Sequence, residues 1–278
     1  MGIEEKFQAL RESLRQIGSL AVAFSGGVDS SLLLKVAAEE LGEKAVAITA
    51  RAEIYPHREI EEATNLARGL GVRHVFVDPA PLTLPDFVAN PPDRCYHCKL
   101  AVFRLILNKA RELGIAVVAD GANADDASDW RPGTRATAEL AVRSPLKEVG
   151  LAKAEIRQLS RRFGLPTADM PSRACLASRV PYGTQIDRET LRRIDQAEAA
   201  LEALGFGGLR VRHHGTIARV ELRPDDIARA TEPGLRGRIV TALKAIGYQY
   251  VALDLEGYRS GSLNEVLAST TLTGDTDD

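Results

Sequence analysis

One short segment, Ser25–Ser30, combines residue types that suit a bound polyphosphate. It reads Ser-Gly-Gly-Val-Asp-Ser and follows the apolar run Leu20–Phe24, which is typical of a buried parallel strand. The residues after it, Ser31–Leu41, have the apolar content of a helix, and Gly42 marks its end. Glycines let the backbone approach a ligand closely, and the amides at the start of a helix donate to phosphate. We therefore expect a strand, a turn and a helix that together bind phosphate groups.

The details of this turn indicate which phosphates it binds. A loop that holds the β and γ phosphates for phosphoryl transfer ends in Lys followed by Ser or Thr, and this loop has no lysine. Its serines and Asp29 suit a pyrophosphate with its Mg²⁺. The motif resembles the PP-loop of ATP pyrophosphatases, which cleave ATP between the α and β phosphates and place AMP on a substrate. The resemblance implies a catalytic role for Asp29 and an ATP-binding role for the whole loop: Ser25, Gly26, Gly27, Val28, Asp29 and Ser30.

The bulk composition limits the classes of protein to consider. The chain has 278 residues, 45% of them hydrophobic and 27% charged, with a net charge of −2. The small negative charge argues against long nucleic acid as a partner. No apolar run approaches the ~20 residues that span a bilayer, and residues 1–18 have no signal-peptide core, so we expect a cytoplasmic protein without a membrane partner. Three cysteines, an odd number, argue against a disulfide framework.

Strand and helix patterns alternate through the first two thirds of the chain. The pattern predicts a doubly wound parallel sheet with helices on both faces, an α/β fold of the adenine nucleotide alpha hydrolase type. Ligands of such sheets bind beyond the carboxyl ends of the strands, so we expect Ala50 and Gly121 to contact ATP as well. Ala50, Arg51 and Glu53, which follow the second strand, either contact the adenosine or form a solvated loop. The polar stretch 127–143 is expected to be a loop over the active site. Asp125 and Asp126, just before it, and Asp129 within it are either turn formers or metal ligands. The strands are predicted at 20–24, 44–50, 72–77 and 116–120, and the helices at 31–41, 56–70, 99–113 and 153–163.

The last third of the chain has a different pattern. Residues 170–183 show neither helix nor strand periodicity, and we place a domain boundary there, with a first domain at 1–180. A small α+β domain is expected at 181–267, with helices at 187–204 and 233–246 and strands at 209–212, 218–222 and 248–253. The segment His213-His214-Gly215 is expected to be the hairpin turn. The acidic residues 268–278 are expected to form a disordered tail.

The three cysteines suggest several kinds of site. Cys95 and Cys98 form a C-x-x-C pair at the start of a predicted helix, and all three thiols converge if the loop with Cys175 covers the same sheet edge. A [4Fe–4S] cluster on three thiolates would leave one iron open for a sulfide or a substrate atom. Zinc would need a fourth ligand, and His97 would point away from the pair. A dithiol redox pair would leave Cys175 unused, a catalytic thiol or persulfide would need no metal, and unrelated buried thiols would do no chemistry.

Taken together, these motifs resemble the LarE-type ATP-dependent sulfur transferases, which build the nickel-pincer nucleotide cofactor. The resemblance covers about residues 19 to 265. It implies a substrate, pyridinium-3,5-biscarboxylic acid mononucleotide, whose carboxylate is adenylated and then converted to a thiocarboxylate. Besides the PP-loop, it rests on five segments: 129–133 (DWRPG), 178–183 (SRVPYG), 210–212 (RVR), 217–222 (IARVEL) and 253–261 (LDLEGYRSG).

The resemblance also implies roles for single residues. Ser178 and Arg179 would position the substrate in catalysis, and Cys175 lies near the cysteine that single-use members of the family sacrifice as a sulfur source. Arg210 and Arg212 are two apart on one strand face and are expected to grip the substrate phosphate, although such residues also occur on solvated faces. Two further acids, Glu198 and Glu221, match acidic positions near the substrate site of the family.

The cysteine pattern differs from that of the single-use members. Cys175 is three residues before Ser178 and out of their register, while Cys95 and Cys98 resemble the three-cysteine branch, in which a [4Fe–4S] cluster carries the transferable sulfur. The sulfur donor is not evident from the residues, and the family implies a homo-oligomer. Three alternatives stay open: a PP-loop tRNA thiolase, an ammonia-dependent amide synthetase similar to NAD synthetase, and a nucleotide sensor without enzymatic activity.

Overall fold

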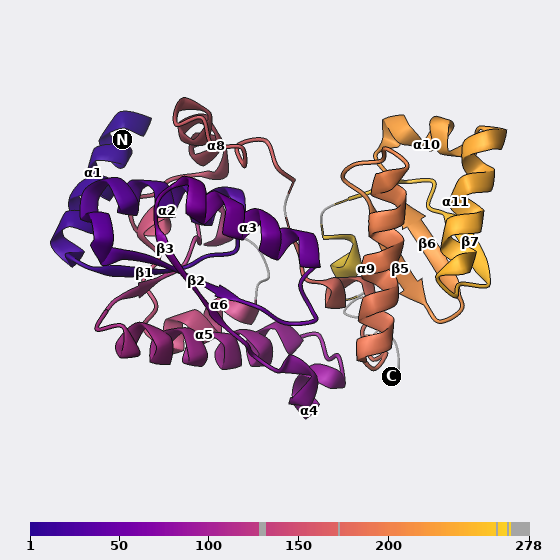
Figure 1. Cartoon of the computed structure of the whole chain (residues 1–278), viewed down its shortest axis with the longest axis horizontal. Helices are drawn as coiled ribbons and strands as arrows, with labels where there is room; N and C mark the ends of the chain where they lie inside the picture. The colour runs from indigo at the N-terminus through magenta and orange to yellow at the C-terminus, as the bar shows by residue number, and fades with distance from the viewer. Residues whose placement is uncertain (128–131, 172, 260, 266, 268–278) are drawn as a thin grey trace, which may run out of the picture. The chain divides into compact units, whose positions relative to one another are not determined.

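The structure is a computed structural model that describes residues 1–127, 132–171, 173–259, 261–265 and 267. These residues form two compact units, which divide between Arg173 and Ala174 (Figure 1). The predicted features at Asp129, Trp130 and Arg131 and the predicted tail, 268–278, lie outside the described residues.

The first unit is built on a parallel sheet of four strands in the order β3-β2-β1-β4. Ala21 pairs with Val46 on one side and with Val118 on the other, so the strand order reverses at β1. Such a reversal opens a crevice at the carboxyl ends of the two strands that flank it. The PP-loop follows β1 and Gly121 follows β4, so both border this crevice. The four strands are those predicted: β1 (Leu20–Ala23), β2 (Ala45–Ala50), β3 (Arg73–Val77) and β4 (Val118–Ala119).

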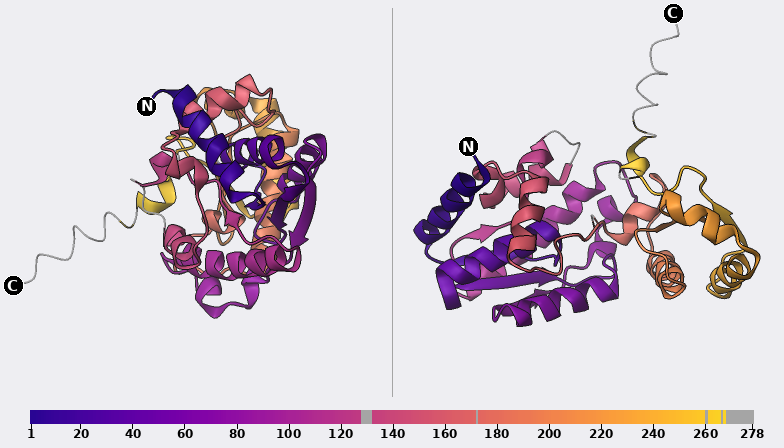
Figure 2. Two further views of the ribbon diagram at one scale, coloured as in Figure 1. Left: turned by 90° about the vertical axis from the view of Figure 1, so that its left-hand side faces the viewer. Right: turned by 90° about the horizontal axis from the view of Figure 1, so that it is seen from above.

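Helices cover both faces of this sheet, which confirms the predicted doubly wound α/β class. In Figure 1 and the left view of Figure 2, α1 (Ile3–Ile17) and α8 (Lys153–Arg162) lie above the sheet and α5 (Arg94–Glu112) lies below it. Helix α2 (Val28–Leu41) contacts α1, α8 and β1, and three consecutive leucines in it, 32–34, are all buried. A helix with this many buried apolar residues is packed against several neighbours, and this helix carries the PP-loop at its start. The remaining helices of this unit are α3 (His57–Gly69), α4 (Pro85–Val88), α6 (Pro132–Glu139) and α7 (Pro145–Glu148).

Two expectations for this unit were wrong. The stretch 127–143 is not a loop throughout, because α6 begins at Pro132, where the fixed proline ring suits the first turn of a helix. Helix α5 begins at Arg94, not at Lys99, so Cys95 and Cys98 are helical residues.

The second unit is the expected small α+β fold. Strands β5 (Arg210–His214) and β6 (Ile217–Glu221) form an antiparallel hairpin, and β7 (Tyr250–Leu253) joins β6 in parallel. His214 pairs with Ile217, so the turn consists of Gly215 and Thr216, and the prediction that both histidines lie in the turn was wrong. The helices are α9 (Arg188–Ala203), α10 (Pro224–Thr231) and α11 (Pro233–Ala245), of which α10 was not predicted.

The two faces of the small sheet differ in character. Side chains of α9 and α11 pack with Val211, Ala218 and Val220 in one apolar core. Because side chains alternate along a strand, the neighbouring residues of β5 and β6 lie on the opposite face. That face carries four charged residues in register, Arg210 opposite Glu221 and Arg212 opposite Arg219.

Candidate active site

The PP-loop is closed by hydrogen bonds among its own residues. Ser25 Oγ lies 3.1 Å from Ser30 Oγ and accepts from the Gly27 N–H at 3.3 Å. Ser30 Oγ in turn donates to the Gly27 carbonyl at 3.3 Å. Helix α2 begins at Val28, so Asp29 and Ser30 lie in the first turn, where backbone N–H groups have no partner within the helix. The loop is therefore shaped around a helix start, which is a favourable place for phosphate.

Two glycines are required by close packing around the loop. Gly26 has φ +69°, and a Cβ there would lie 2.8 Å from the Cβ of Ala63 on α3. A Cβ on Gly121 would lie 2.8 Å from the Ser30 backbone nitrogen. Gly121 thus lets the segment after β4 contact the loop. Ala50 is the last residue of β2 and half-buried, and its contact with ATP stays a prediction.

Lys153 supplies the positive charge that the loop motif lacks. Its Nζ lies 2.5 Å from Asp29 Oδ2, and its backbone N–H donates to Asp125 Oδ2 at 2.8 Å. The other carboxylate oxygen of Asp29 is buried and has no hydrogen-bond partner within the described part of the chain. An unsatisfied buried carboxylate oxygen beside a phosphate site suits a Mg²⁺ ligand. Sequence reasoning missed Lys153 because 124 residues separate it from Asp29, and the only available signal was its place at the start of a helix.

The acids of the segment after β4 make turn contacts. Asp126 Oδ2 accepts from the Asn123 N–H, and Asn123 Oδ1 accepts from the Asp125 N–H, both at 2.9 Å. Such bonds are typical of Asx turns. This geometry favours the interpretation of Asp125 and Asp126 as turn formers.

Cys95 and Cys98 lie in the first two turns of α5. Cys95 is exposed and Cys98 is buried, and residues three apart share one helix face, so the two thiols suit a common metal or cluster. Cys175 is half-buried and belongs to the second unit, so the convergence of all three thiols stays a prediction. Among the residues that the structure describes, no group of three His, Cys, Asp or Glu side chains is arranged to hold a metal ion.

Helix α6 holds the cysteine-bearing turns of α5 in place. The Tyr96 hydroxyl donates to Glu139 Oε2 at 2.9 Å, and the Arg135 guanidinium lies 3.8 Å from the centre of the Tyr96 ring. A Cβ on Gly133 would lie 2.5 Å from Cδ of Lys99, so the lysine stem runs close along the α6 backbone. These contacts give the C-x-x-C pair a fixed setting.

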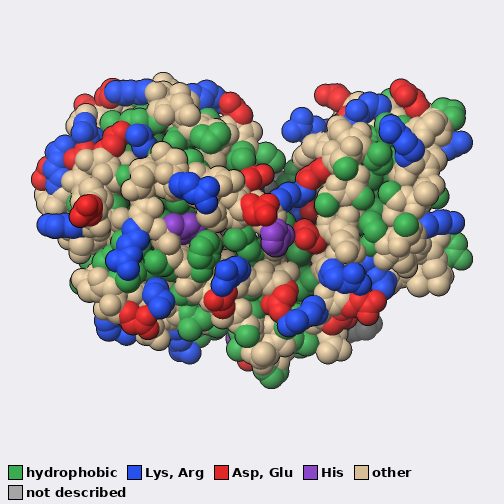
Figure 3. Space-filling model, in the orientation of Figure 1, with side chains coloured by type: hydrophobic (Ala, Val, Ile, Leu, Met, Phe, Trp, Pro, Cys, Tyr) green, Lys and Arg blue, Asp and Glu red, His purple; other side chains and the backbone are tan. Residues whose placement is uncertain are grey.

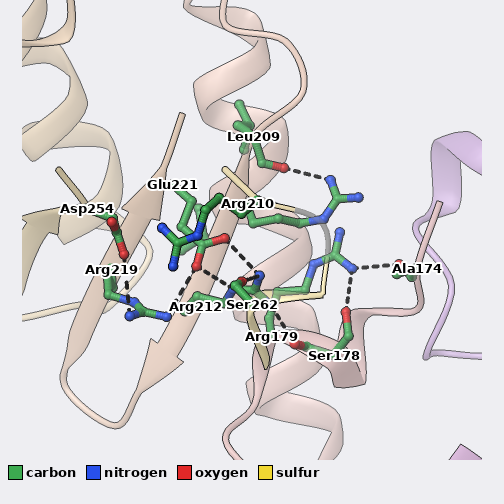
Figure 4. Close-up of polar contacts among 12 residues, drawn as sticks. Ala174, Ser178, Arg179, Leu209, Arg210, Arg212, Arg219, Glu221, Asp254 and Ser262 are labelled. Atoms are coloured by element: carbon green, nitrogen blue, oxygen red, sulfur yellow. Dashed lines mark hydrogen bonds and ion pairs between the residues drawn. The ribbon is translucent and has the colours of Figure 1, made fainter. Parts of the chain in front are cut away.

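In the second unit, Arg179 and Glu198 form a fully buried ion pair. Nε and Nη2 of Arg179 each donate to one oxygen of Glu198 at 2.9 Å, and both side chains are 1% exposed. Arg179 Nη1 also donates to the carbonyls of Ala174 and Cys175 and to Ser178 Oγ, at 2.6, 2.9 and 3.0 Å. Figure 4 shows the bonds of this side chain to Ala174 and Ser178. It holds the segment around Cys175 in one conformation.

A second buried pair joins Arg212 and Glu221 across the hairpin. Nε and Nη2 of Arg212 donate to the two oxygens of Glu221 at 2.8 Å. Its nitrogens also donate to the Ser178 carbonyl at 2.7 Å and to Ser262 Oγ at 2.8 Å (Figure 4). Arg212 is only 6% exposed, so the alternative of a solvated strand face does not hold at this position. The reason is that the segments with Ser178 and Ser262 cover this part of the sheet.

Arg210 lies next to both pairs. Its Nη1 donates to the Leu209 carbonyl at 2.7 Å, and its guanidinium lies 5.0 Å from the centre of the Tyr258 ring. Burial and the neighbouring charge of Arg179 lower the pKa of Arg210. Burial alone would raise the pKa of Glu198, but Arg179, Arg210 and the Val211 N–H hold it below its usual value. An anion placed beside Arg210 would relieve this repulsion among cations.

The structure therefore brings together all the residues predicted in the second unit. Ser178 contacts both Arg179 and Arg212, and each of these arginines takes one of the two predicted acids. Sequence reasoning missed Arg219, which lies 3.2 Å from Glu221 and 3.4 Å from Asp254. Its register opposite Arg212 was the signal that could have identified it.

The outer surface gives no sign of a basic tract on the face in view. In Figure 3, Lys and Arg side chains are interspersed with Asp and Glu. Over the described residues, we find no helix with the length and apolarity needed to cross a membrane.

A parallel sheet with a Ser-Gly-Gly-x-Asp-Ser loop at its switch point defines a PP-loop ATP pyrophosphatase. In agreement, the family described as asparagine synthase matches residues 5–193. A tRNA-specific 2-thiouridylase MnmA of a Bradyrhizobium species, 31% identical, covers 54% of this chain and 47% of its own length.

Two relatives match nearly the whole chain. Pyridinium-3,5-bisthiocarboxylic acid mononucleotide synthase of Lactiplantibacillus plantarum is 34% identical over 96% of both chains. An uncharacterised Synechocystis protein, slr1717, is 42% identical over 95% of this chain and 99% of its own. The chain belongs to the LarE-type family of ATP-dependent sulfur transferases, which confirms the expected class of enzyme.

Proposed function

We propose that this protein uses ATP to adenylate a carboxylate of pyridinium-3,5-biscarboxylic acid mononucleotide and converts it to a thiocarboxylate for the nickel-pincer nucleotide cofactor. The observation that carries the proposal is the arginine cluster of the second unit, in which Arg179 and Arg212 are buried beside Glu198 and Glu221, Arg210 is half-buried, and Arg219 lies at the more exposed edge. Burial and the neighbouring positive charge of Arg179 lower the pKa of Arg210, so an anion beside Arg210 would be favoured. A substrate phosphate would supply that anion.

The chemistry needs two displacements. A carboxylate is a poor acyl donor, because its oxygen is a poor leaving group. In the first step the substrate carboxylate oxygen attacks the α-phosphorus of ATP, and the bond from that phosphorus to the β-phosphate oxygen breaks, which releases pyrophosphate. In the second step a sulfur nucleophile attacks the acyl carbon, and AMP leaves with the electron pair of the broken C–O bond.

The first unit has groups suited to the first displacement. The amides of the PP-loop and the Lys153 ammonium would stabilise the charge that develops on the departing pyrophosphate. Asp29 would hold Mg²⁺, which, when bound, screens the phosphate charges. Its buried unpaired oxygen supports this role.

The second unit has groups suited to the substrate. Arg210 would be the principal phosphate ligand, because Arg212 already gives most of its donors to Glu221, Ser178 and Ser262. Ser178, which contacts Arg179 and Arg212, would orient the substrate. Cys95, Cys98 and Cys175 would hold a [4Fe–4S] cluster, which, when bound, supplies a transferable sulfide.

The test of the proposed reaction is carboxylate-dependent pyrophosphate release. The full chain is incubated with MgATP, the mononucleotide substrate and sulfide, and pyrophosphate, AMP and thiocarboxylate are measured. Arg210→Ala should raise KM for the mononucleotide by about tenfold to a hundredfold with little change in KM for ATP. Arg236→Ala, in helix α11, is the matched control. Equal KM values for Arg210→Ala and wild type would remove the proposed phosphate site.

The cluster is tested separately. Anaerobic reconstitution followed by iron and sulfide counting should give about four of each per chain. Cys95→Ser and Cys98→Ser should lose iron and sulfur transfer while retaining adenylation. Full sulfur transfer by either variant would exclude the cluster and leave a catalytic thiol or persulfide at Cys175.

A second candidate, tRNA thiolation, is favoured by the similarity to the thiouridylase. It predicts salt-sensitive tRNA binding and pyrophosphate release that depends on tRNA. We also infer a homo-oligomer, which sedimentation of the full chain would test.

A further inference from the structure

A chain of hydrogen bonds crosses three strands and ends at the peptide that opens the PP-loop. The Phe24 carbonyl accepts from Thr49 Oγ1 on β2 at 2.6 Å. Thr49 Oγ1 lies 2.8 Å from His74 Nε2 on β3. Phe24 is 2% and Thr49 4% exposed, so water does not compete for the bond between them. The chain therefore joins the edge strand of the sheet to the strand that carries the loop.

The direction of each bond fixes which ring nitrogen of His74 carries a proton. A carbonyl only accepts, so the Thr49 hydroxyl proton points to Phe24, and the Thr49 oxygen accepts from the histidine. The Nε2 atom of His74 is therefore protonated and acts as the donor. Nδ1 is buried and has no partner among the residues described. The His74 ring lies between Phe24 and Phe76, with centroid distances of 5.9 and 4.4 Å.

Helices α3 and α5 both pack against β3, the strand of His74, and charged residues also follow β2 and β3. Arg51, after β2, pairs with Asp78, after β3, at 2.7 Å. Burial lowers the pKa of His74. A proton on Nδ1 would place a charge and an unsatisfied donor in this buried setting. The other titratable groups on β3 and α3 are Arg73, His57, Arg58, Glu59, Glu61, Glu62 and Arg68.

We propose that His74 is a positioning residue for ATP: through Thr49 it fixes the Phe24 carbonyl and thereby aims the first amide of the PP-loop. The Phe24 carbonyl and the Ser25 N–H belong to one planar peptide group, so holding one fixes the direction of the other. Ser25 also begins the hydrogen bonds that close the loop. These hydrogen bonds involve neither the acyl substrate nor the sulfur donor. Failure of the proposed sulfur transfer would therefore leave the role of His74 intact.

The test measures the Kd of the full chain for MgATP by titration calorimetry. Thr49→Val and His74→Phe should each weaken binding by about tenfold, equivalent to about 1.4 kcal/mol. Their combination should be no worse than either alone, because both remove the same link. Thr49→Ser and His74→Gln keep a donor at the required atom and should stay within about twofold of wild type. Thr137→Val is the control, since that hydroxyl donates to a carbonyl at 3.0 Å and its residue is 6% exposed.

Rescue by the conservative variants separates positioning from a merely structural role. Thr49→Ser and His74→Gln restore the hydrogen-bond donor without restoring the original side-chain shape, so recovery of the Kd for MgATP in these variants reports the hydrogen bond itself. Three results would overturn the proposal: wild-type affinity in Thr49→Val, an equal loss in Thr137→Val, or a loss in His74→Gln as large as in His74→Phe. If His74→Phe does not fold, the Thr49 variants still decide.

Discussion

The PP-loop of the first unit and the arginine cluster of the second bring donors to an anion in opposite ways. The loop uses backbone amides and small side chains around a helix start, and its polar side chains bond mostly to the loop itself. The cluster uses long charged side chains that are removed from water and neutralised in pairs. The loop is therefore sensitive to added volume, whereas the cluster is sensitive to lost charge.

This difference follows from the cost of burying each kind of group. A backbone amide at a helix start carries only a partial charge, and it needs no counter-charge while it waits for a ligand. A guanidinium removed from water costs several kcal/mol unless a carboxylate accompanies it. The second unit meets that requirement with Glu198 and Glu221, each held by two hydrogen bonds from one arginine.

The largest effect should come from removing one member of a buried pair. The Arg179 side chain is 1% exposed in the wild-type protein, and Glu198→Ala removes the carboxylate with which it pairs. We expect a loss of about 3–5 kcal/mol in the free energy of unfolding of the second unit. Urea unfolding followed by circular dichroism measures it.

A double substitution serves as the control for this prediction. Arg179→Met with Glu198→Leu removes both charges and should recover most of the lost stability, although not substrate binding. If Glu198→Ala unfolded like wild type, the cluster would not depend on paired charge, and the contrast with the loop would fail.

The next effect tests the loop with a single methyl group. Gly26→Ala places a Cβ 2.8 Å from that of Ala63, at a φ of +69°. We expect MgATP binding at least about tenfold weaker, because the loop must move away from α3. Calorimetric titration of the full chain with MgATP measures this.

Gly114→Ala separates backbone strain from collision in that experiment. Gly114 has a nearly equal φ of +73°, and nothing lies within 4 Å of the added Cβ. This variant should lose some stability through strain and bind ATP normally. Weak ATP binding in both variants would show that strain alone disturbs the loop.

Acid should affect the cluster through the pKa of Glu198. Its pKa is held below the usual value, so its pair contributes stability above the ordinary glutamate pKa of about 4.3. That contribution should decline as pH falls from there through the lowered pKa, because the unfolded chain takes up the proton more readily than the buried pair does. Urea unfolding between pH 7 and pH 3.5 measures the decline. The double variant Arg179→Met with Glu198→Leu lacks both charges, so its free energy of unfolding should depend less on pH. Identical pH profiles for this variant and wild type would contradict a lowered pKa of Glu198 in the folded protein.

The PP-loop and its sheet could be predicted because their signals are contiguous in the sequence. A run of apolar residues, two glycines and a leucine-rich helix follow one another within Leu20–Leu41, and each of the four strands lies within two residues of its predicted bounds. Helix α6 was missed because the stretch 127–143 is polar, and no helix was predicted over the residues of α10. Both helices begin at a proline, Pro132 and Pro224, which suits the first turn of a helix.

The site of the second unit was predicted only as a set of residues. Their pairing could not be read from the sequence, because Arg179 meets Glu198 from 19 residues away and Arg212 meets Ser262 from 50. Lys153 was missed for the same reason, since only the folded sheet brings it to Asp29. Alternation along β5 placed Arg210 and Arg212 on one face but could not show that other segments cover it.

The smallest effect should come from an exposed pair in which the same two arginine nitrogens, Nε and Nη2, donate to a carboxylate. Arg161 Nε and Nη2 donate to Asp169 Oδ1 at 3.1 and 2.7 Å, with the two side chains 56% and 74% exposed. Water already solvates both groups, so Arg161→Ala should shift the melting temperature by about 1 °C or less. Differential scanning calorimetry of Arg161→Ala and of Glu198→Ala then compares the shift in melting temperature for a solvent-exposed ion pair with the shift for a buried one. If both variants shifted the melting temperature by a similar amount, the hydrogen bonds between the paired side chains, and not their burial, would determine how sensitive the cluster is to the loss of a charge.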